Sequence, residues 1–251
     1  MSLNLSAIVL TKNEERNIVD CLRNLSWADE VLVLDSGSED ATVALAQEMG
    51  ARVERSPFDN FPRQRNAALE LAQGGWVFFV DADERVSEEL AGEVQKAITQ
   101  EEAVGFWVPR HNYIFGRLIR HAGWYPDCQL RLFRRHKGRY DESREVHELV
   151  ILDGPEGYLE NPLIHDNYEG IGQFIERQSR YTEMEAAYLF RGGARAKVRS
   201  FVFQPCREFR RRYITLKGYK DGRHGLLLSL LMAYYEGVKY LKLWRLQRRG
   251  A

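Results

Sequence analysis

Two carboxylates one residue apart, Asp81 and Asp83, stand where an apolar run ends. The run covers residues 76–80, Trp-Val-Phe-Phe-Val, and follows two glycines, a pattern that predicts a buried strand. Because burying two like charges in a core is costly, we expect both side chains to face a cleft. Carboxylates in that position suit a hard divalent cation, Mg²⁺ or Mn²⁺, which in turn suits phosphates. The pair alone could instead be two solvated turn residues before a helix.

The elements that must position this pair alternate between strands and helices. Strands are expected at 6–10, 31–34, 52–54 and 76–80, and helices at about 14–25, at about 40–49, from Pro62 to the glycines at 74–75, and after Ser87. Such alternation predicts an α/β fold, a mostly parallel sheet flanked by helices. Ligands of such sheets collect at the carboxyl ends of the strands. The polar loops 11–14, 35–38 and 81–83 should therefore meet at one edge.

Composition and charge divide the chain into a body and a tail. Its 251 residues, 44% hydrophobic and 29% charged, fit one α/β domain, 1–169, followed by a helical extension, 170–251. Residues 191–251 hold 16 Lys and Arg against 3 Asp and Glu, whereas the rest holds 20 against 33. Three widely spaced cysteines and no basic-then-apolar leader pattern predict a cytoplasmic protein with reduced thiols.

The basic tail predicts contact with an anionic membrane surface. Its longest apolar stretch, 226–244, contains Glu236, Lys239 and Lys242, which argues against a bilayer span. A helix lying on the inner face of the cytoplasmic membrane fits the mixture of apolar and basic residues. Alternatively, the tail packs on the acidic body and neutralises it. No nucleic-acid-binding motif is present, so nucleic acid is not an expected partner.

Four motifs together resemble the family 2 glycosyltransferases of the GT-A, or Rossmann-like, fold. They are 8–14 (Ile-Val-Leu-Thr-Lys-Asn-Glu), 35–40 (Asp-Ser-Gly-Ser-Glu-Asp), 63–68 (Arg-Gln-Arg-Asn-Ala-Ala) and 81–83 (Asp-Ala-Asp). The match covers about the first 135 residues. Residues 127–134, 146–148 and the basic tail look like the branch that contains lipopolysaccharide core glucosyltransferases. The resemblance implies a nucleotide-sugar donor, a divalent cation and inversion at the anomeric carbon.

The resemblance also suggests roles for the polar strand ends. Asp83 would bind the metal, and Asp81 would orient the donor's ribose or assist at the metal. Asp35 would accept a hydrogen bond from the base, uracil by analogy, although Asp in an Asp-Ser-Gly-Ser loop also forms an Asx-turn readily and both can hold. Thr11 and Glu14 would line the same pocket, or Glu14 could serve only as an acid in the first turn of a helix.

Positive and imidazole side chains complete the expected donor site. Arg65 and Asn66 lie at a helix start, where anions are favoured, and could meet the diphosphate; a solvated charged face is the alternative. Arg131 would lie near the diphosphate or pair with an acidic neighbour. His165 is a candidate further metal ligand, although a lone His is more often structural.

A base must take the proton of the acceptor hydroxyl as it attacks. Asp127 is the first choice, because it follows an aromatic loop, 123–126, that could stack on sugar faces. It could also be only a turn residue after Pro126. Glu148 is the second choice, and neither spacing shows which carboxylate reaches the acceptor.

These features predict a metal-dependent inverting glycosyltransferase that moves a hexose, glucose from UDP-glucose, to a lipid-linked glycan or a lipopolysaccharide core. A nucleotidyltransferase that makes sugar nucleotides is one alternative, but residues 11–14 lack the glycines of its phosphate loop. A catalytically inactive, membrane-associated interaction module is another. The intact carboxylates at 35, 81 and 83 argue against it.

Overall fold

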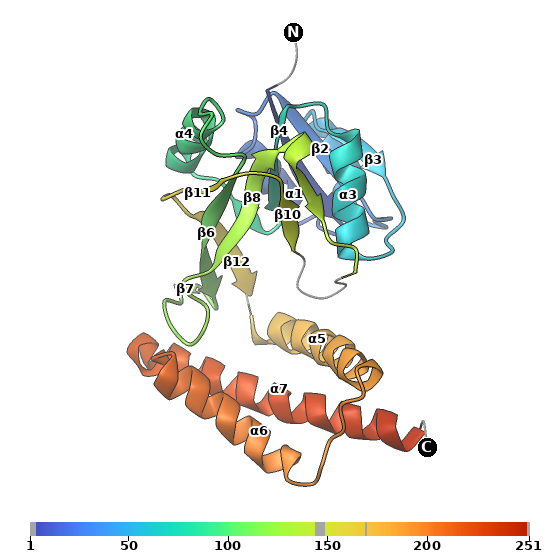
Figure 1. The fold of residues 1–251 in the computed structure, drawn as a ribbon, viewed down its shortest axis with the longest axis vertical. Coiled ribbons are helices and arrows are strands. Elements are labelled where there is room, and N and C mark those ends of the chain that lie inside the picture. The colour runs from blue at the N-terminus through green and yellow to red at the C-terminus, as the bar shows by residue number, and fades with distance from the viewer. Residues whose placement is uncertain (1–3, 144–148, 169, 250–251) are drawn as a thin grey trace. The chain divides into compact units, whose positions relative to one another are not determined.

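The computed structural model describes residues 4–143, 149–168 and 170–249 (Figure 1). Within them, ten strands form one sheet along the path β3-β2-β1-β4-β8-β6-β12-β5, with β7 and β11 beside β6, and β9 pairs with β10. The strands are β1 (Leu5–Thr11), β2 (Glu30–Asp35), β3 (Arg52–Arg55), β4 (Trp76–Asp81), β5 (Glu84–Arg85), β6 (Gly105–Ile114), β7 (Arg117–Leu118), β8 (Cys128–Arg134), β9 (Gly138–Tyr140), β10 (Val150–Leu152), β11 (Glu156–Tyr158) and β12 (Leu163–Tyr168).

Side-chain caps stand at the start of two of the helices. Asn60 accepts the Arg63 N–H at 3.0 Å at the start of α3, which has Pro62 in its first turn, and Ser87 caps α4 as predicted. The helices are α1 (Ile18–Arg23), α2 (Thr42–Glu48), α3 (Phe61–Leu71), α4 (Glu88–Ala97), α5 (Ile171–Arg191), α6 (Ser200–Phe209) and α7 (Gly222–Arg249), with short turns η1 (Arg135–Lys137), η2 (Arg210–Thr215) and η3 (Gly218–Asp221).

The first predicted helix is shorter than expected. Residues 14–17 form a turn in which the Glu14 carbonyl accepts the N–H groups of Asn17 and Ile18, and α1 starts only at Ile18. Asn13, just before this turn, has a left-handed φ of 57°, so the extended conformation of β1 does not pass directly into a helix. Polar residues therefore remain in a loop after β1, at the edge where the donor site was predicted.

The parallel half of the sheet aligns three strand ends. Strands β1, β2, β3 and β4 run parallel, with Thr11 opposite Asp35 and Leu10 opposite Asp81. Strand β8 then runs antiparallel to both β4 and β6. The loops after β1, β2 and β4 consequently lie at one edge, as the sequence predicted, and the sheet becomes mixed beyond β4.

Both faces of this sheet are covered, which explains the unbroken apolar run of β4. Phe78 packs into one core cluster with Leu22 and Leu90, from α1 and α4. Phe79 belongs to the opposite cluster, with Leu69 from α3. A strand buried on both faces has no polar alternation, because neither side meets water.

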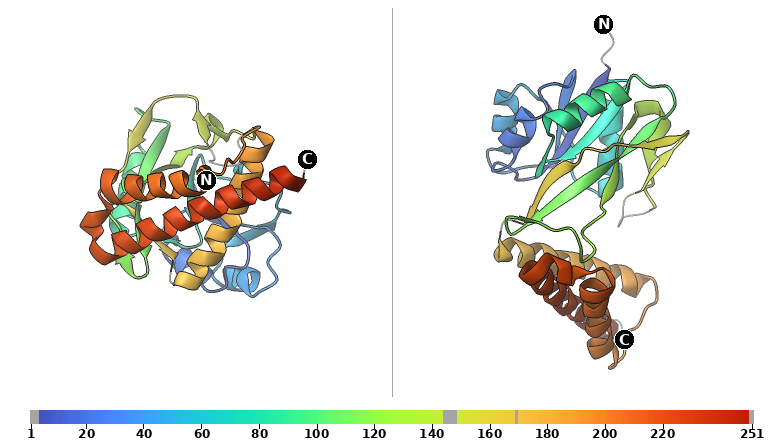
Figure 2. Two further views of the ribbon diagram at one scale, coloured as in Figure 1. Left: turned by 90° about the horizontal axis from the view of Figure 1, so that it is seen from below. Right: turned by 90° about the vertical axis from the view of Figure 1, so that its left-hand side faces the viewer.

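The chain separates into two compact units. The first comprises residues 1–110 and 127–165, and the second comprises 111–126 and 166–251. The second unit thus joins the loop 111–126 to the helices α5, α6 and α7, around Ile119, Phe174 and Leu228. Figure 2 shows α6 and α7 running along each other within this unit. The sequence-based domain limit at 169 stays a prediction. Among the described residues, no helix is both long and apolar enough to span a bilayer.

Candidate active site

Two of the three predicted metal ligands, Asp83 and His165, come together although 82 positions separate them, and we call them the Asp83–His165 pair. After β4 the chain turns into the two-residue strand β5, which pairs antiparallel with β12 so that Glu84 lies opposite His165. This register brings His165 Nε2 to 3.4 Å from Asp83 Oδ2. The side chains retain only 8% and 15% exposure, so the pair lies in a largely enclosed position.

Asp81 is committed to arginines instead. Arg131 donates from Nη1 to Oδ1 at 3.1 Å and from Nη2 to Oδ2, and Arg65 Nη2 lies 3.3 Å from Oδ1. Burial raises the pKa of Asp81, but Arg131 and Arg65 outweigh it and hold that pKa well below its usual range. Both carboxylate oxygens therefore accept from arginines, and a role of Asp81 at the ribose or the metal stays a prediction.

The two arginines of this cluster are buried. Arg65 lies 5.3 Å from the Phe79 ring centre and 5.5 Å from that of Tyr140, so it does not belong to a solvated charged face. Arg131 pairs with Asp81 and also reaches Glu84 at 3.3 Å. Of the two alternatives for Arg131, the structure shows the pairing with acidic neighbours. A diphosphate contact by either arginine stays a prediction.

Glu84 and Arg110 are site residues that the sequence reasoning missed. Glu84 is fully buried; its Oε2 accepts the Asp81 N–H at 2.9 Å, and Oε1 lies 3.2 Å from Arg110 Nη1. A two-residue strand is too short to show periodicity, so the acidic run at 81–84 did not reveal which member faces inward. The acidity of that run was the only signal available.

Asp127, the first choice for the base, keeps partial access to solvent. Its Oδ2 accepts from Arg110 Nε at 2.8 Å and its Oδ1 from Gln129 Nε2 at 2.8 Å, while 20% of the side chain is exposed. The guanidinium and amide fix the orientation of this carboxylate. Glu148, the second choice, lies outside the described residues, so the choice between them stays a prediction.

Asp35 forms the Asx-turn that was one of its two expected roles. It is fully buried, and its Oδ2 accepts the N–H groups of Gly37 and Ser38 at 2.9 Å. Its Oδ1 accepts from the Ser38 hydroxyl and, at 3.3 Å, from the buried Thr11 hydroxyl. Contact with a base stays a prediction, since a base would have to share or replace these local donors.

Glu14 and Asn66 have structural partners. Glu14 Oε2 accepts from Asn17 at 2.8 Å, within the turn that precedes α1. Asn66 donates to the Tyr140 carbonyl at 3.0 Å and accepts the Tyr140 N–H at 2.9 Å. Both polar atoms of the buried Asn66 amide thus hold β9 against α3, and its expected contact with the diphosphate stays a prediction.

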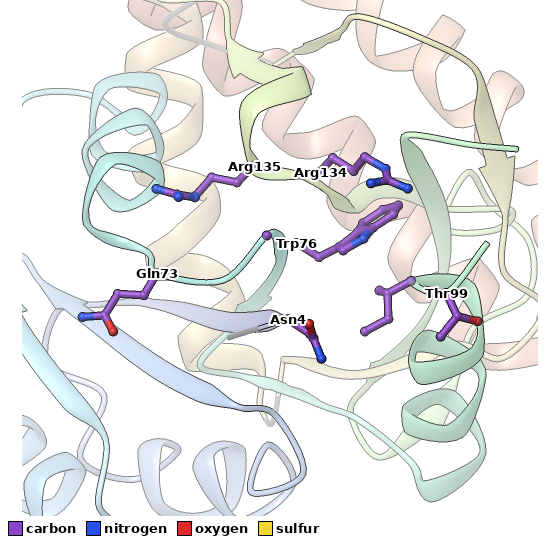
Figure 3. A pocket seen from close by; sticks show the side chains of 8 residues that line it. Asn4, Gln73, Trp76, Thr99, Arg134 and Arg135 are labelled. Carbon is purple, nitrogen blue, oxygen red and sulfur yellow. The ribbon is translucent and has the colours of Figure 1, made fainter. Parts of the chain in front are cut away.

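A cavity of about 540 Å³ lies away from these residues (Figure 3). Its lining includes Trp76, the first residue of β4, whereas Asp81 is the last, so the cavity and the carboxylates lie at opposite ends of that strand. In Figure 3 the side chains of Arg134 and Arg135 extend in different directions rather than toward one point. None of the predicted site residues lines it, and we assign the chemistry to the carboxyl ends of the strands.

The fold and the carboxylates at its strand ends define a glycosyltransferase of the GT-A class. The chain belongs to glycosyl transferase family 2, whose family model matches residues 6–149. It is 30% identical to the lipopolysaccharide core biosynthesis glycosyltransferase LpsC of Rhizobium meliloti (strain 1021), over 97% of this chain and 93% of LpsC. An uncharacterized glycosyltransferase of Rickettsia felis is 38% identical, over 95% of this chain and 89% of its own length.

A solved structure also has a similar fold. Residues 1–349 of S. aureus TarS, in complex with UDP-GlcNAc, superpose with a TM-score of 0.50 at 15% identity, covering 99% of this chain and 92% of that one. The predicted fold class, GT-A with a C-terminal helical extension, is confirmed. The predicted resemblance to the lipopolysaccharide core branch is confirmed by the similarity to LpsC.

Proposed function

We propose that this glycosyltransferase is metal-dependent and inverting, and that it transfers glucose from UDP-glucose to a lipid-linked glycan or lipopolysaccharide core acceptor. The observation that supports it most directly is the approach of Asp83 and His165 to 3.4 Å beside the strand ends. The similarity to LpsC over nearly the whole chain supports the acceptor class. Family membership favours this function over the nucleotidyltransferase alternative.

The residues present fit a divalent cation. Asp83 and His165 supply an oxygen and a nitrogen ligand from one place, a donor set that Mn²⁺ accepts and Mg²⁺ accepts less readily. Among residues 4–143, 149–168 and 170–249, no third His, Cys, Asp or Glu joins them, so donor phosphate oxygens and water would complete the shell. A cation bound there would offset the charge that develops on the departing UDP.

The protein's own residues would position the two reactants. Asp127 would take the proton from the acceptor hydroxyl, with Arg110 and Gln129 holding its carboxylate in place. Arg131 and Arg65 would keep Asp81 ionised and fixed at the start of the metal-side loop. Inversion follows if the base acts on the face of the sugar opposite the leaving UDP.

A donor screen tests the proposal. We expect UDP release from UDP-glucose with Mn²⁺ or Mg²⁺ and its loss with a chelator. Calorimetry should show metal-dependent UDP binding, which Asp83→Ala abolishes and the exposed control Asp20→Ala retains. UDP binding of equal strength with and without metal would overturn the metal site. No turnover of any nucleotide sugar would instead favour the inactive membrane module.

We also propose that the helical unit rests on an anionic membrane at its inner, cytoplasmic face. On α6, Val202 and Phe203 are 65% and 70% exposed. The exposed Arg199, Arg207 and Arg210 follow helical spacing from them, so apolar and basic groups share one face. Anionic lipid headgroups complement that charge, and the apolar side chains can enter the headgroup region.

A further inference from the structure

Six charged side chains in the catalytic unit form one continuous chain of contacts. It begins at Arg65 and ends at Asp127, and its three carboxylates and three guanidiniums balance in formal charge. The printed sequence separates these residues widely, and the fold of one unit brings them together. The members are Arg65, Asp81, Arg131, Glu84, Arg110 and Asp127.

Glu84 lies inside this chain, between Arg131 and Arg110. A buried carboxylate is costly unless it is paired, and Glu84 has a backbone N–H and two guanidiniums around it. Its backbone also pairs with His165, directly beside Asp83. Glu84 is therefore fixed both to the loop that carries the metal pair and to the arginines behind it.

Arg110 connects Glu84 to the candidate base. One nitrogen, Nη1, lies 3.2 Å from Glu84 Oε1, and another, Nε, donates to Asp127 at 2.8 Å. Because the guanidinium is planar and rigid, the two carboxylates that it contacts are held at a set distance and angle. A lysine ammonium in its place would keep the charge without this geometry.

We propose that Glu84 and Arg110 are positioning residues, which hold the base Asp127 in register with the Asp83–His165 pair. The catalytic part of this inference rests on the proposed function, in which Asp127 acts as the base. Transfer needs the acceptor oxygen and the donor's anomeric carbon to meet in a narrow geometry, and small misplacements are costly. A rigid ion-pair chain between the two sides of the site supplies that register.

The same chain should also set the charge environment of Asp127. Arg110 from β6 faces it directly, the Gln129 amide and the neighbouring Cys128 thiol come from β8, and the charges behind Arg110 are Glu84, Asp81 and Arg131. Removing the positive charge of Arg110 should raise the pKa of Asp127. Removing the negative charge of Glu84 should lower that pKa. Opposite shifts would show that both charges act on Asp127, and the effect on turnover is tested separately.

The first test measures Asp127 itself, without donor or metal. In protein with ¹³Cγ-labelled aspartate, the signal lost in Asp127→Asn identifies the residue. We expect Arg110→Gln to raise its titration midpoint by about one pH unit, and Glu84→Gln to lower it by less. Glu88→Gln, an exposed control on α4, should leave it unchanged. Shifts in the same direction, or no shift in either variant, would overturn the coupling.

The second test separates charge from geometry and does not need the buried Glu84 variant to fold. Arg110→Lys should keep the Asp127 midpoint near wild type while UDP release from UDP-glucose falls in kcat by about 10- to 100-fold, with an unchanged KM for the donor. Full kcat in Arg110→Lys, together with an inactive Asp127→Asn, would overturn the positioning role alone. Full activity in Asp127→Asn would overturn both that role and the base assignment.

Discussion

Asp81→Asn should strongly destabilise the catalytic unit even though the substitution is nearly isosteric. The wild-type carboxylate is bound by Arg131 through both oxygens and by Arg65 through one. With an amide in its place, the buried Arg131 and Arg65 both lose the negative charge of Asp81, although Arg131 keeps its contact with Glu84. Breaking a buried pair by removing one partner costs about 3–5 kcal/mol. Because 31% of the Asp81 side chain is exposed and water can relieve part of this cost, we expect the lower end, about 3 kcal/mol.

Thermal unfolding followed by circular dichroism measures this effect. For a unit of this size, about 3 kcal/mol corresponds to a fall in Tm of roughly 6–12 °C. The matched control is Asp20→Asn, which removes the partner of Arg23 in a pair whose side chains are 55% and 66% exposed. An exposed pair is worth less than about 1 kcal/mol, so the control should barely change Tm. Equal Tm values for the two variants would refute the description of Asp81 as the counter-ion of two buried arginines.

The pH dependence of the same variant checks the sign of the argument. Since the arginines depress the pKa of folded Asp81, its contribution to stability is complete above the unfolded value of about 4 and declines as the pH falls below it. The difference in unfolding free energy between wild type and Asp81→Asn should therefore shrink in acid. A difference that stays constant from neutral pH to acid would show that Asp81 is not held ionised by Arg131 and Arg65.

Three further variants separate structural from functional roles. Asn66→Ala should lower the unfolding free energy by about 1–3 kcal/mol, because it removes both hydrogen bonds to the Tyr140 backbone, while UDP affinity by calorimetry stays unchanged. A selective loss of UDP binding would instead support a contact between Asn66 and the diphosphate. His165→Gln should weaken Mn²⁺-dependent UDP binding by about tenfold or more without altering metal-free binding, and an unaltered Mn²⁺ dependence would remove His165 from the metal site. Phe203→Glu should reduce pelleting with anionic liposomes at low salt, whereas Met49→Glu, on the catalytic unit, should not; equal pelleting of both would contradict membrane contact through α6.

The sequence predicted the fold well where local signals and sheet topology agree. The alternation of strands and helices, the cap at Ser87, the position of Pro62 in a first helical turn, and the meeting of three polar loops at one edge all follow from patterns within a few residues. Helix boundaries were predicted less accurately. At α1, Asn13 and the turn after it place the start of the helix later than expected. There, side-chain and backbone hydrogen bonds replaced the first helical turn.

The side-chain contacts of the candidate site could be foreseen from the sequence only where they are local. The side-chain bonds of Asp35 to the following loop were foreseeable, because an Asp-Ser-Gly-Ser segment forms them by itself. The partners of Asn66 were not, because Tyr140 comes from a strand more than 70 residues away. A motif position alone does not show whether a polar side chain faces a ligand or a neighbouring strand.

The turn after β4 and the short strand β5 explain why the three carboxylates of residues 81–84 have three different sets of partners. Asp81 ends β4, Asp83 lies in the turn at residues 82–83, and Glu84 begins β5, so the three side chains leave the backbone in different directions. Asp81 therefore meets arginines, Asp83 meets His165, and Glu84 enters the buried ion-pair chain. Two carboxylates neutralised by guanidiniums leave Asp83 as the member of the run beside an imidazole, which is why we place the metal on Asp83 rather than on Asp81.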